Sequence, residues 1–209
     1  MITIFTSVWR TPDRPVILAS QSPRRRDILS LMGFDFEVMA PSVENENVFF
    51  SGGSIGVSLE ALAAAKAQSV SAQKPAALVL GADTIVCVDR TVLGKPASRA
   101  EAGEMLRLLS GRTHTVYTSV ALVCAECGFA ARATEETRVV FCDLSARDID
   151  DYLGREEYRD KAGAYAIQGR AMVFIDRIEG CYYNVVGLPV RKTIGLFTAY
   201  STRKDPQNA

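Results

Sequence analysis

The chain has 209 residues, which is enough for one domain to bury a core without a disulfide or a structural metal. Lys plus Arg and Asp plus Glu both number 24, so no net charge favours binding to nucleic acid or to a membrane surface. No apolar run approaches the length of a membrane span, and the segment 1–14 lacks the apolar core of a secretion signal. We therefore expect a cytoplasmic protein with neither nucleic acid nor a membrane among its partners.

The five cysteines are odd in number and scattered along the chain. Without an export signal, reduced thiols are the simplest expectation. Cys124 and Cys127 form a C-x-x-C, for which a redox pair or a metal site is the alternative. Only one histidine is present and there is no second C-x-x-C, so a complete zinc site is hard to assemble. We expect an ordinary hairpin turn between two apolar strands.

The first half of the chain predicts alternating strands and helices. A buried strand over 16–19 leads into a helix over about 24–32, with Ser22 as N-cap and Pro23 at the first helical position. The elements expected next are a strand over 34–40, a polar loop over 42–56, an alanine-rich helix over 57–71, a strand over 77–80, and a hairpin of 84–88 with 91–93 around Asp89-Arg90.

The second half adds longer strands and further capped helices. Ser98 and Glu101 form a predicted capping box for a helix that reaches about Leu109, and Ser145 caps another that ends at Gly154. The other expected elements are strands over 115–124, 129–142 and 171–178, a turn at Gly180, and a last helix from Pro189 to about Tyr200. Interleaved helices with adjacent hairpins indicate an α/β fold with a mixed sheet. We expect a leader over 1–15, one domain over 16–200 and a frayed tail over 201–209.

Ser20-Gln21-Ser22-Pro23-Arg24-Arg25-Arg26 lies at a predicted strand-to-helix turn. A helix N-terminus presents unpaired N–H groups and the positive end of a dipole, which suits a phosphate. Hydroxyl and guanidinium groups there would add further donors. The alternative is that the arginines form a solvated helix face and the serines only cap the helix.

Gly81-Ala82-Asp83-Thr84 directly follows a predicted buried strand. A carboxylate at the carboxyl end of such a strand lies where open α/β sheets bind ligands. It could hold a divalent metal or take a proton from an attacking water. The alternative is an aspartate that only makes a turn.

Two further segments are rich in small and polar residues. Ser110-Gly111-Arg112-Thr113-His114 could place Arg112 against a polyphosphate, whereas a lone histidine is more often a structural hydrogen-bonding residue, so His114 is not taken as catalytic. Lys161-Ala162-Gly163-Ala164-Tyr165-Ala166-Ile167-Gln168-Gly169 suits a loop packed against a ligand. The Gln168 amide can both donate and accept, so it could read the edge of a base.

Six phrases in order resemble the Maf family over about residues 16–200. They are Leu18-Ala19-Ser20-Gln21-Ser22-Pro23-Arg24-Arg25, Gly81-Ala82-Asp83-Thr84, Gly94-Lys95-Pro96, Ser110-Gly111-Arg112-Thr113-His114, the 161–169 segment and Asn184-Val185-Val186-Gly187-Leu188-Pro189. The resemblance implies an elongated mixed sheet with flanking helices and a cleft between two lobes, as in the inosine triphosphate pyrophosphatases. It also implies a homodimer that hydrolyses a nucleoside triphosphate between its α- and β-phosphates with a divalent cation, Mg²⁺ or Mn²⁺.

The same resemblance implies roles for individual residues. Asp83 matches the proton acceptor, and Ser20, Arg25, Lys66 and Lys95 resemble the polar and phosphate-contacting set. Arg24, Thr84 and Gln168 match positions tied to substrate choice in the dTTP/UTP branch. The branch that acts on 7-methyl-GTP carries a glutamate where Gln168 stands, and a carboxylate there would repel the carbonyls of uracil or thymine.

One stretch departs from the family pattern. Many members have an acidic pair after the second strand, but here the sequence reads Val43-Glu44-Asn45-Glu46, with Asn45 at the expected acid. Either Glu44 or Glu46 substitutes, with Glu44 beside Asp83 as the expected metal ligands, or the metal affinity is weaker.

The resemblance leaves other functions open. One alternative is a pyrophosphatase of broader range or one acting on modified nucleotides, and another is a nucleotide-binding regulator of cell division that does not hydrolyse its ligand.

Overall fold

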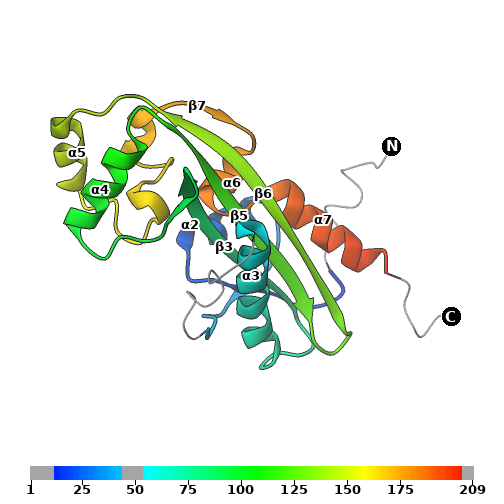
Figure 1. The fold of residues 1–209 in the computed structure, drawn as a ribbon. Helices are drawn as coiled ribbons and strands as arrows, with labels where there is room; N and C mark the ends of the chain where they lie inside the picture. The colour runs from blue at the N-terminus through cyan, green and yellow to red at the C-terminus, as the bar shows by residue number, and fades with distance from the viewer. Residues whose placement is uncertain (1–11, 44–53, 204–209) are drawn as a thin grey trace. The chain divides into compact units, whose positions relative to one another are not determined.

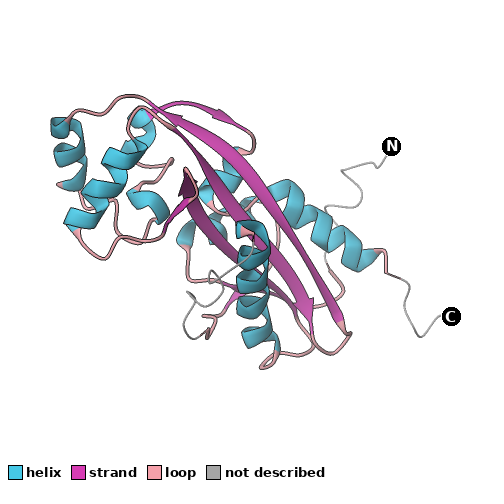
Figure 2. Ribbon diagram, in the orientation of Figure 1, coloured by secondary structure: helices cyan, strands magenta, loops and turns pink. Residues whose placement is uncertain are grey.

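The structure, a computed structural model, describes residues 12–43 and 54–203 (Figure 1). Its centre is a seven-stranded sheet in the order β2-β1-β3-β5-β6-β7, with β4 paired to β3. Strand β1 is parallel to β2 and β3, whereas β4 is antiparallel to β3 and β7 is antiparallel to β6. Helices accompany this sheet (Figure 2), so the predicted α/β class with a mixed sheet is confirmed.

The strands and helices have the following bounds. The strands are β1 (Val16–Ala19), β2 (Glu37–Val38), β3 (Leu78–Val88), β4 (Thr91–Leu93), β5 (Thr113–Cys124), β6 (Phe129–Phe141) and β7 (Ile175–Glu179). The helices are α2 (Pro23–Leu31), α3 (Ile55–Ser71), α4 (Arg99–Leu109), α5 (Ala146–Leu153), α6 (Tyr182–Val186) and α7 (Val190–Ser201), with short 3₁₀ segments at Ala162–Ala164 and Arg170–Phe174.

Four predicted strands differ from the structure. The segments 77–80 and 84–88 are parts of the single strand β3, which runs without a break through Gly81 and Asp83. The strand expected over 34–40 is reduced to Glu37–Val38, whose side chains are exposed. The strand expected from Ala171 begins only at Ile175, because the preceding residues form a 3₁₀ segment.

The three serines predicted as N-caps stand at the starts of α2, α4 and α5, but their capping bonds differ, and α3 begins at Ile55, inside the loop expected over 42–56. Ser22 stands at the N-cap of α2 and Pro23 follows it, yet the Ser22 side chain makes no capping hydrogen bond. Ser98 accepts a hydrogen bond from the Glu101 N–H, but the Glu101 carboxylate accepts from the N–H of Ala97, so the predicted capping box is only half formed. Ser145 caps α5 in a complete box with Asp148.

The chain divides into two compact units. The first comprises the residues up to Asp83, Ser119–Thr134 and the residues from Gly187 onward. Its apolar cluster joins side chains of β1, β3 and β5 to the small face of α3, and its members are Ile17, Ala19, Ala63, Ala67, Val70, Ala77, Val79, Ala121 and Val123. Leu18, Leu80 and Leu122, which alternate with these strand residues, are 0% exposed. Both faces of β1, β3 and β5 are therefore buried in this unit.

The second unit comprises Thr84–Thr118 and Glu135–Val186. Its core packs α4 and α5 with side chains of β3, β5 and β6 and of the 161–174 segment. Phe141 lies edge-on to both His114 and Tyr165, with ring centroids 4.9 Å apart in each pair. The 161–169 segment is thereby packed on the same core as the sheet strands of this unit.

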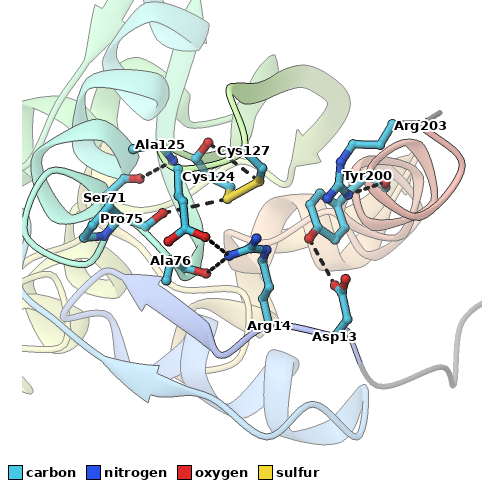
Figure 3. The surroundings of a disulfide bond; sticks show 11 residues. Asp13, Arg14, Ser71, Pro75, Ala76, Cys124, Ala125, Cys127, Tyr200 and Arg203 are labelled. Atoms are coloured by element: carbon cyan, nitrogen blue, oxygen red, sulfur yellow. Dashed lines mark hydrogen bonds and ion pairs between the residues drawn. A yellow bond between two sulfur atoms is a disulfide. The ribbon is translucent and has the colours of Figure 1, made fainter. Parts of the chain in front are cut away.

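The β5–β6 turn of the first unit corrects one expectation. Cys124 and Cys127 form a disulfide across the predicted turn, with Cα atoms 5.6 Å apart, so they are not the reduced thiols that the sequence suggested. The turn is fixed by its neighbours (Figure 3): the Ala125 N–H donates to Ser71 Oγ over 3.1 Å, and Arg14 forms an ion pair with Glu126 at 3.0 Å. The other three cysteines, Cys87, Cys142 and Cys181, are not disulfide-bonded.

The expected leader and tail lie partly outside the described residues, which begin at Pro12 and end at Arg203. Of the leader, Arg14 reaches Glu126, and Asp13 accepts a hydrogen bond from the Tyr200 hydroxyl (Figure 3). In the described ranges, 12–43 and 54–203, no helix has the length and apolar character needed to span a membrane.

Candidate active site

The turn from β1 into α2 holds a polar cluster in the first unit. Ser20 follows the last residue of β1 and is 5% exposed. Its Oγ accepts hydrogen bonds from the Ser22 N–H at 3.2 Å and from Arg25 Nη1 at 3.1 Å. Arg25 Nε donates to the carbonyl of Gly187 at 2.9 Å. Arg25 therefore joins this turn to the segment that precedes α7, and Ser20 holds the guanidinium from the other side.

A short ion pair joins α3 to β3 in the same unit. Lys66 Nζ lies 2.6 Å from Asp83 Oδ1, and the two side chains are only 11% and 16% exposed. Gly81 makes this approach possible, because a Cβ at that position would stand 2.3 Å from the Ala63 carbonyl oxygen and 2.8 Å from the Ala67 nitrogen. Lys66 lies between these two residues on α3. The glycine of the Gly81-Ala82-Asp83 phrase thus brings the lysine to the carboxylate.

Asp83 and Thr84 are consecutive residues of β3, between its pairing with β1 and its pairing with β4. Pairing with β1 ends at Gly81, and pairing with β4 begins at Val86. Residues 82–85 therefore lie between the segment of β3 that pairs with β1 and the segment that pairs with β4. Because successive side chains leave a strand on opposite faces, the side chains of Asp83 and Thr84 lie on opposite faces of β3.

Thr84 belongs to the second unit, where its hydroxyl lies 2.9 Å from that of Thr118. Thr118 Oγ1 in turn donates to the carbonyl of Asn184 at 2.9 Å. Neither Thr118 nor Asn184 was singled out as a site residue from the sequence. Asn184 opens the last of the six phrases, which was the only signal that could have pointed to it.

Lys95 and Gln168 lie in two loops of the second unit that are joined through glycines. The Gly163 N–H donates to the carbonyl of Gly94 at 3.0 Å. Gly163 has a φ of 67°, and a Cβ there would lie 3.0 Å from the side chain of Val86. Only glycine fits such a close approach in that conformation. The loop that carries Gln168 is therefore held against β3 and against the residue preceding Lys95.

Gln168 itself is exposed and lies in a turn closed by the Gly169 N–H, which donates to the carbonyl of Ala166 at 2.9 Å. Glu157 holds the far side of this turn, because its Oε2 accepts from the Arg170 N–H at 2.7 Å. The turn is tied at both ends while the Gln168 side chain is open to solvent. Such a side chain can meet a ligand without breaking the fold.

The predicted site residues are divided between the two units. Ser20, Arg24, Arg25, Lys66 and Asp83 belong to the first unit, and Thr84, Lys95 and Gln168 belong to the second. Arg24 lies in the first turn of α2 and is partly buried. Glu44, with Asn45 and Glu46, lies outside the described residues. Within 12–43 and 54–203 no group of three or more His, Cys, Asp or Glu side chains could hold a metal ion.

Two residues of the Ser110-Gly111-Arg112-Thr113-His114 phrase have structural partners. Arg112 forms an ion pair with Asp89 inside the second unit, which accounts for its charge without a phosphate. His114 is 1% exposed, and its Nε2 lies 2.7 Å from the Tyr165 hydroxyl. Burial lowers the pKa of His114 to about 4, so the imidazole is neutral at neutral pH. His114 therefore fits the structural role that was expected for a lone histidine.

These features define an α/β protein with a serine–arginine turn after β1 and a lysine–carboxylate pair just beyond the point where the parallel β1–β3 pairing ends. Open α/β sheets bind ligands at the carboxyl ends of their parallel strands. The family profile described as Maf-like protein matches residues 15–200. The chain belongs to the Maf family.

Several curated relatives share one name. A dTTP/UTP pyrophosphatase of Symbiobacterium thermophilum is 50% identical over 185 residues, which cover 88% of this chain and 93% of the relative. Proteins of the same name from Bacillus anthracis and Bacillus mycoides are 44% and 45% identical over 181 residues, again covering 87% of this chain and 93% of each relative.

Proposed function

We propose that this protein hydrolyses dTTP and UTP to the nucleoside monophosphate and pyrophosphate. The observation that carries the proposal is the buried pair of Lys66 on α3 and Asp83 on β3, 2.6 Å apart; β3 is parallel to β1, the strand that leads into the Ser20 turn. The relatives named dTTP/UTP pyrophosphatase, at 44–50% identity, support the choice of substrate. A cationic, hydroxyl-rich site with one carboxylate suits hydrolysis of a polyphosphate.

The triphosphate would be bound by Ser20, Arg24, Arg25, Lys66 and Lys95. Ser20 Oγ already accepts from two N–H groups, so its own hydroxyl hydrogen is the one it can offer to a phosphate oxygen. The Arg25 guanidinium is anchored through Nε and Nη1, so its positive charge is held in place at the turn. Rigid groups of this kind neutralise phosphate charge without reorganising during the reaction.

Asp83 would orient a water molecule and accept its proton as the oxygen attacks the α-phosphorus. The bond between that phosphorus and the bridging oxygen to the β-phosphate breaks, and pyrophosphate leaves with the electron pair. Lys66 holds Asp83 Oδ1, which leaves Oδ2 as the oxygen for the water. Such phosphoryl chemistry depends mostly on positioning and on charge neutralisation.

A divalent cation fits the oxygen donors present. Mg²⁺ is commonly held by one or two carboxylates together with substrate phosphates and water, and Asp83 supplies a carboxylate of which one oxygen is engaged by Lys66. Glu44 is the second carboxylate that we assign to the ion. When bound, Mg²⁺ or Mn²⁺ would neutralise phosphate charge and polarise the phosphoryl oxygens.

Thr84, Gln168 and Arg24 would select the base. The Gln168 amide can donate to a carbonyl and accept from an N–H, both of which uracil and thymine present. Its exposure on a turn tied at both ends supports this role. We further propose a cytoplasmic homodimer, which the family resemblance suggests, with a nucleoside triphosphate rather than nucleic acid or a membrane as the partner.

Product analysis tests the proposal directly. The purified protein is incubated with UTP, dTTP, CTP and 7-methyl-GTP in Mg²⁺ or Mn²⁺, and monophosphate, pyrophosphate and orthophosphate are separated. We expect monophosphate and pyrophosphate in equal amounts, fastest from UTP and dTTP. Diphosphate and orthophosphate as the products, or a preference for 7-methyl-GTP, would overturn it.

A further inference from the structure

A chain of hydroxyl groups lies behind Thr84 in the second unit. Thr84 Oγ1 and Thr118 Oγ1 are 2.9 Å apart, and Thr118 Oγ1 is 2.9 Å from the carbonyl oxygen of Asn184. Thr118 and Asn184 are both 0% exposed, so bulk water cannot substitute for these partners. The three groups form a continuous hydrogen-bonded relay from the protein interior to Thr84.

The direction of this relay follows from the chemistry of its inner end. A carbonyl oxygen can only accept, so the single hydroxyl hydrogen of Thr118 must point to Asn184. Thr118 can then only accept from Thr84, although the distance between the two hydroxyls alone permits either direction. The hydroxyl hydrogen of Thr84 is therefore directed inward, to Thr118.

The inner end is fixed by a second set of bonds. Asn184 Nδ2 donates to the carbonyl of Val116 and to Thr137 Oγ1, both at 2.9 Å. Thr137 Oγ1 donates to the carbonyl of Cys181 and accepts from the Cys181 N–H. Since these acceptors require the amide nitrogen of Asn184 to face them, the side chain has one orientation. Its backbone carbonyl is thereby held under Thr118.

With its hydrogen directed inward, Thr84 Oγ1 must accept any further hydrogen bond. We propose that Thr118 is a positioning residue for specificity, which makes Thr84 an acceptor for an N–H group on the edge of the substrate's base. Uracil and thymine carry such a donor at N3, whereas the N3 of cytosine is an acceptor and would face the lone pairs of Thr84. The proposal rests on the proposed function, because it takes Thr84 to contact the base.

Thr118→Val tests the relay, because valine keeps the shape of threonine and removes the hydroxyl. Without Thr118 Oγ1 the Thr84 hydroxyl can turn and donate, so discrimination between an N–H and a lone pair is lost. We expect the preference for UTP over CTP to fall about 2- to 10-fold, the range of one hydrogen bond. Thr118→Ser keeps the hydroxyl and should keep the preference.

The matched control is the neighbouring residue of β5. Ser119 is also 0% exposed, and its hydroxyl lies 2.7 Å from that of Thr134 in the first unit. Ser119→Ala removes a buried hydroxyl from the same strand without touching Thr84, and the UTP:CTP preference should be unchanged. A fall as large as that of Thr118→Val would mean that any loss of a buried hydroxyl in β5 disturbs selection, which overturns the relay.

Binding and turnover are measured separately so that two failures can be told apart. Dissociation constants for UTP and CTP are measured by calorimetry in the Asp83→Asn background, and kcat/KM in the background with Asp83 intact. Failure to release pyrophosphate would defeat the proposed function, yet a Thr118-dependent UTP:CTP binding ratio would still support the relay. An unchanged ratio in Thr118→Val, or no binding of either nucleotide, overturns the relay.

A double-substitution cycle shows whether Thr118 acts through Thr84. In a Thr84→Val background, Thr118→Val should not change the UTP:CTP ratio further, whereas additive effects would place its action elsewhere. Thermal unfolding is monitored for every variant. If Thr118→Val does not fold, Thr118→Ala takes its place with the same expected loss of preference.

Discussion

Lys66 Nζ lies 2.6 Å from Asp83 Oδ1, and this pair is buried where α3 meets β3. Removing one partner of a short, largely buried ion pair lowers the free energy of unfolding, because the remaining charge is left unpaired in a low-dielectric site. The lysine therefore does more than contribute positive charge towards a phosphate. It fixes the carboxylate on which the proposed chemistry depends.

Asp83→Asn should keep the fold, because asparagine keeps the size of the side chain, but it leaves the buried Lys66 ammonium without its carboxylate, so we expect a lower free energy of unfolding. An amide cannot accept a proton from water at neutral pH. We expect turnover of UTP to fall by about 10²- to 10⁴-fold, as when a positioned general base is lost. Pyrophosphate release at the rate of the unsubstituted protein would remove Asp83 from the mechanism.

Lys66→Met should affect both stability and turnover. Methionine fills most of the same space but leaves the Asp83 carboxylate 16% exposed and without its 2.6 Å partner. We expect unfolding to become easier by roughly 3 kcal/mol, measured by urea denaturation. The double variant Lys66→Met, Asp83→Asn should recover much of that loss, because no stranded charge is left. If the double variant is as unstable as Lys66→Met, lost packing and not the ion pair explains the effect.

Gly81→Ala tests the close approach of α3 to β3. The added methyl would stand 2.3 Å from the Ala63 carbonyl oxygen, so α3 has to move. We expect a loss of about 1–3 kcal/mol in the free energy of unfolding, as for an overpacked core, and lower turnover as Lys66 shifts away from Asp83. Gly195→Ala in α7 is the control, since nothing lies within 4 Å of its Cβ position. There we expect no loss, or a gain of about 0.5–1 kcal/mol from better helix propensity.

His114 predicts a specific acid sensitivity. Burial lowers its pKa from 6.5 to about 4, so the folded protein binds the proton more weakly than the unfolded chain does. The stability it contributes is complete above pH 6.5 and is lost as the pH falls towards 4. We expect this residue alone to remove about 2 kcal/mol between pH 7.5 and pH 5.0.

Urea denaturation at the two pH values, on the native chain and on His114→Gln, isolates this contribution from that of the carboxylates. The pH-dependent loss should be smaller in the variant by about that amount, because glutamine does not titrate. Equal losses in both proteins would show that His114 does not set the acid sensitivity.

Gln168→Glu should damage selection more than catalysis. A carboxylate on the exposed turn would repel the carbonyl oxygens of uracil and thymine, whereas the phosphate groups are bound elsewhere. We expect kcat/KM for UTP and dTTP to fall more than that for 7-methyl-GTP, measured as a full nucleotide panel. An equal loss with every nucleotide would indicate that Gln168 only supports its turn.

Local signals predicted β1, α4 and α5 almost to the residue, because a buried run, a capping serine or a terminal glycine marks each end. The break expected at Gly81-Ala82-Asp83 was wrong for a physical reason. Glycine there serves the packing of α3, and this depends on residues of another element. The 3₁₀ segment at Arg170–Phe174 was likewise hidden, since its apolar residues suit a strand equally well.

The contacts of the candidate site likewise join separate elements, so local sequence signals did not predict them. Asp83 could be chosen because it follows the apolar run 77–80, but its pairing with Lys66 could not, because the two are 17 residues apart on different elements. No motif or local sequence pattern identifies Thr118 as a site residue. Its importance comes only from the bonds on either side of it, to Thr84 and to the Asn184 carbonyl.

The disulfide of the β5–β6 turn also decides which sulfur atoms can be labelled. With Cys124 and Cys127 joined, Cys87 buried and Cys181 partly covered, Cys142 is the exposed thiol. A maleimide dye added to the oxidised protein should therefore attach first at Cys142, in the second unit. Gentle reduction then frees two thiols at the turn of the first unit, of which Cys124 is buried and Cys127 is partly exposed, so a dye of another colour should attach there at Cys127 without any engineered cysteine.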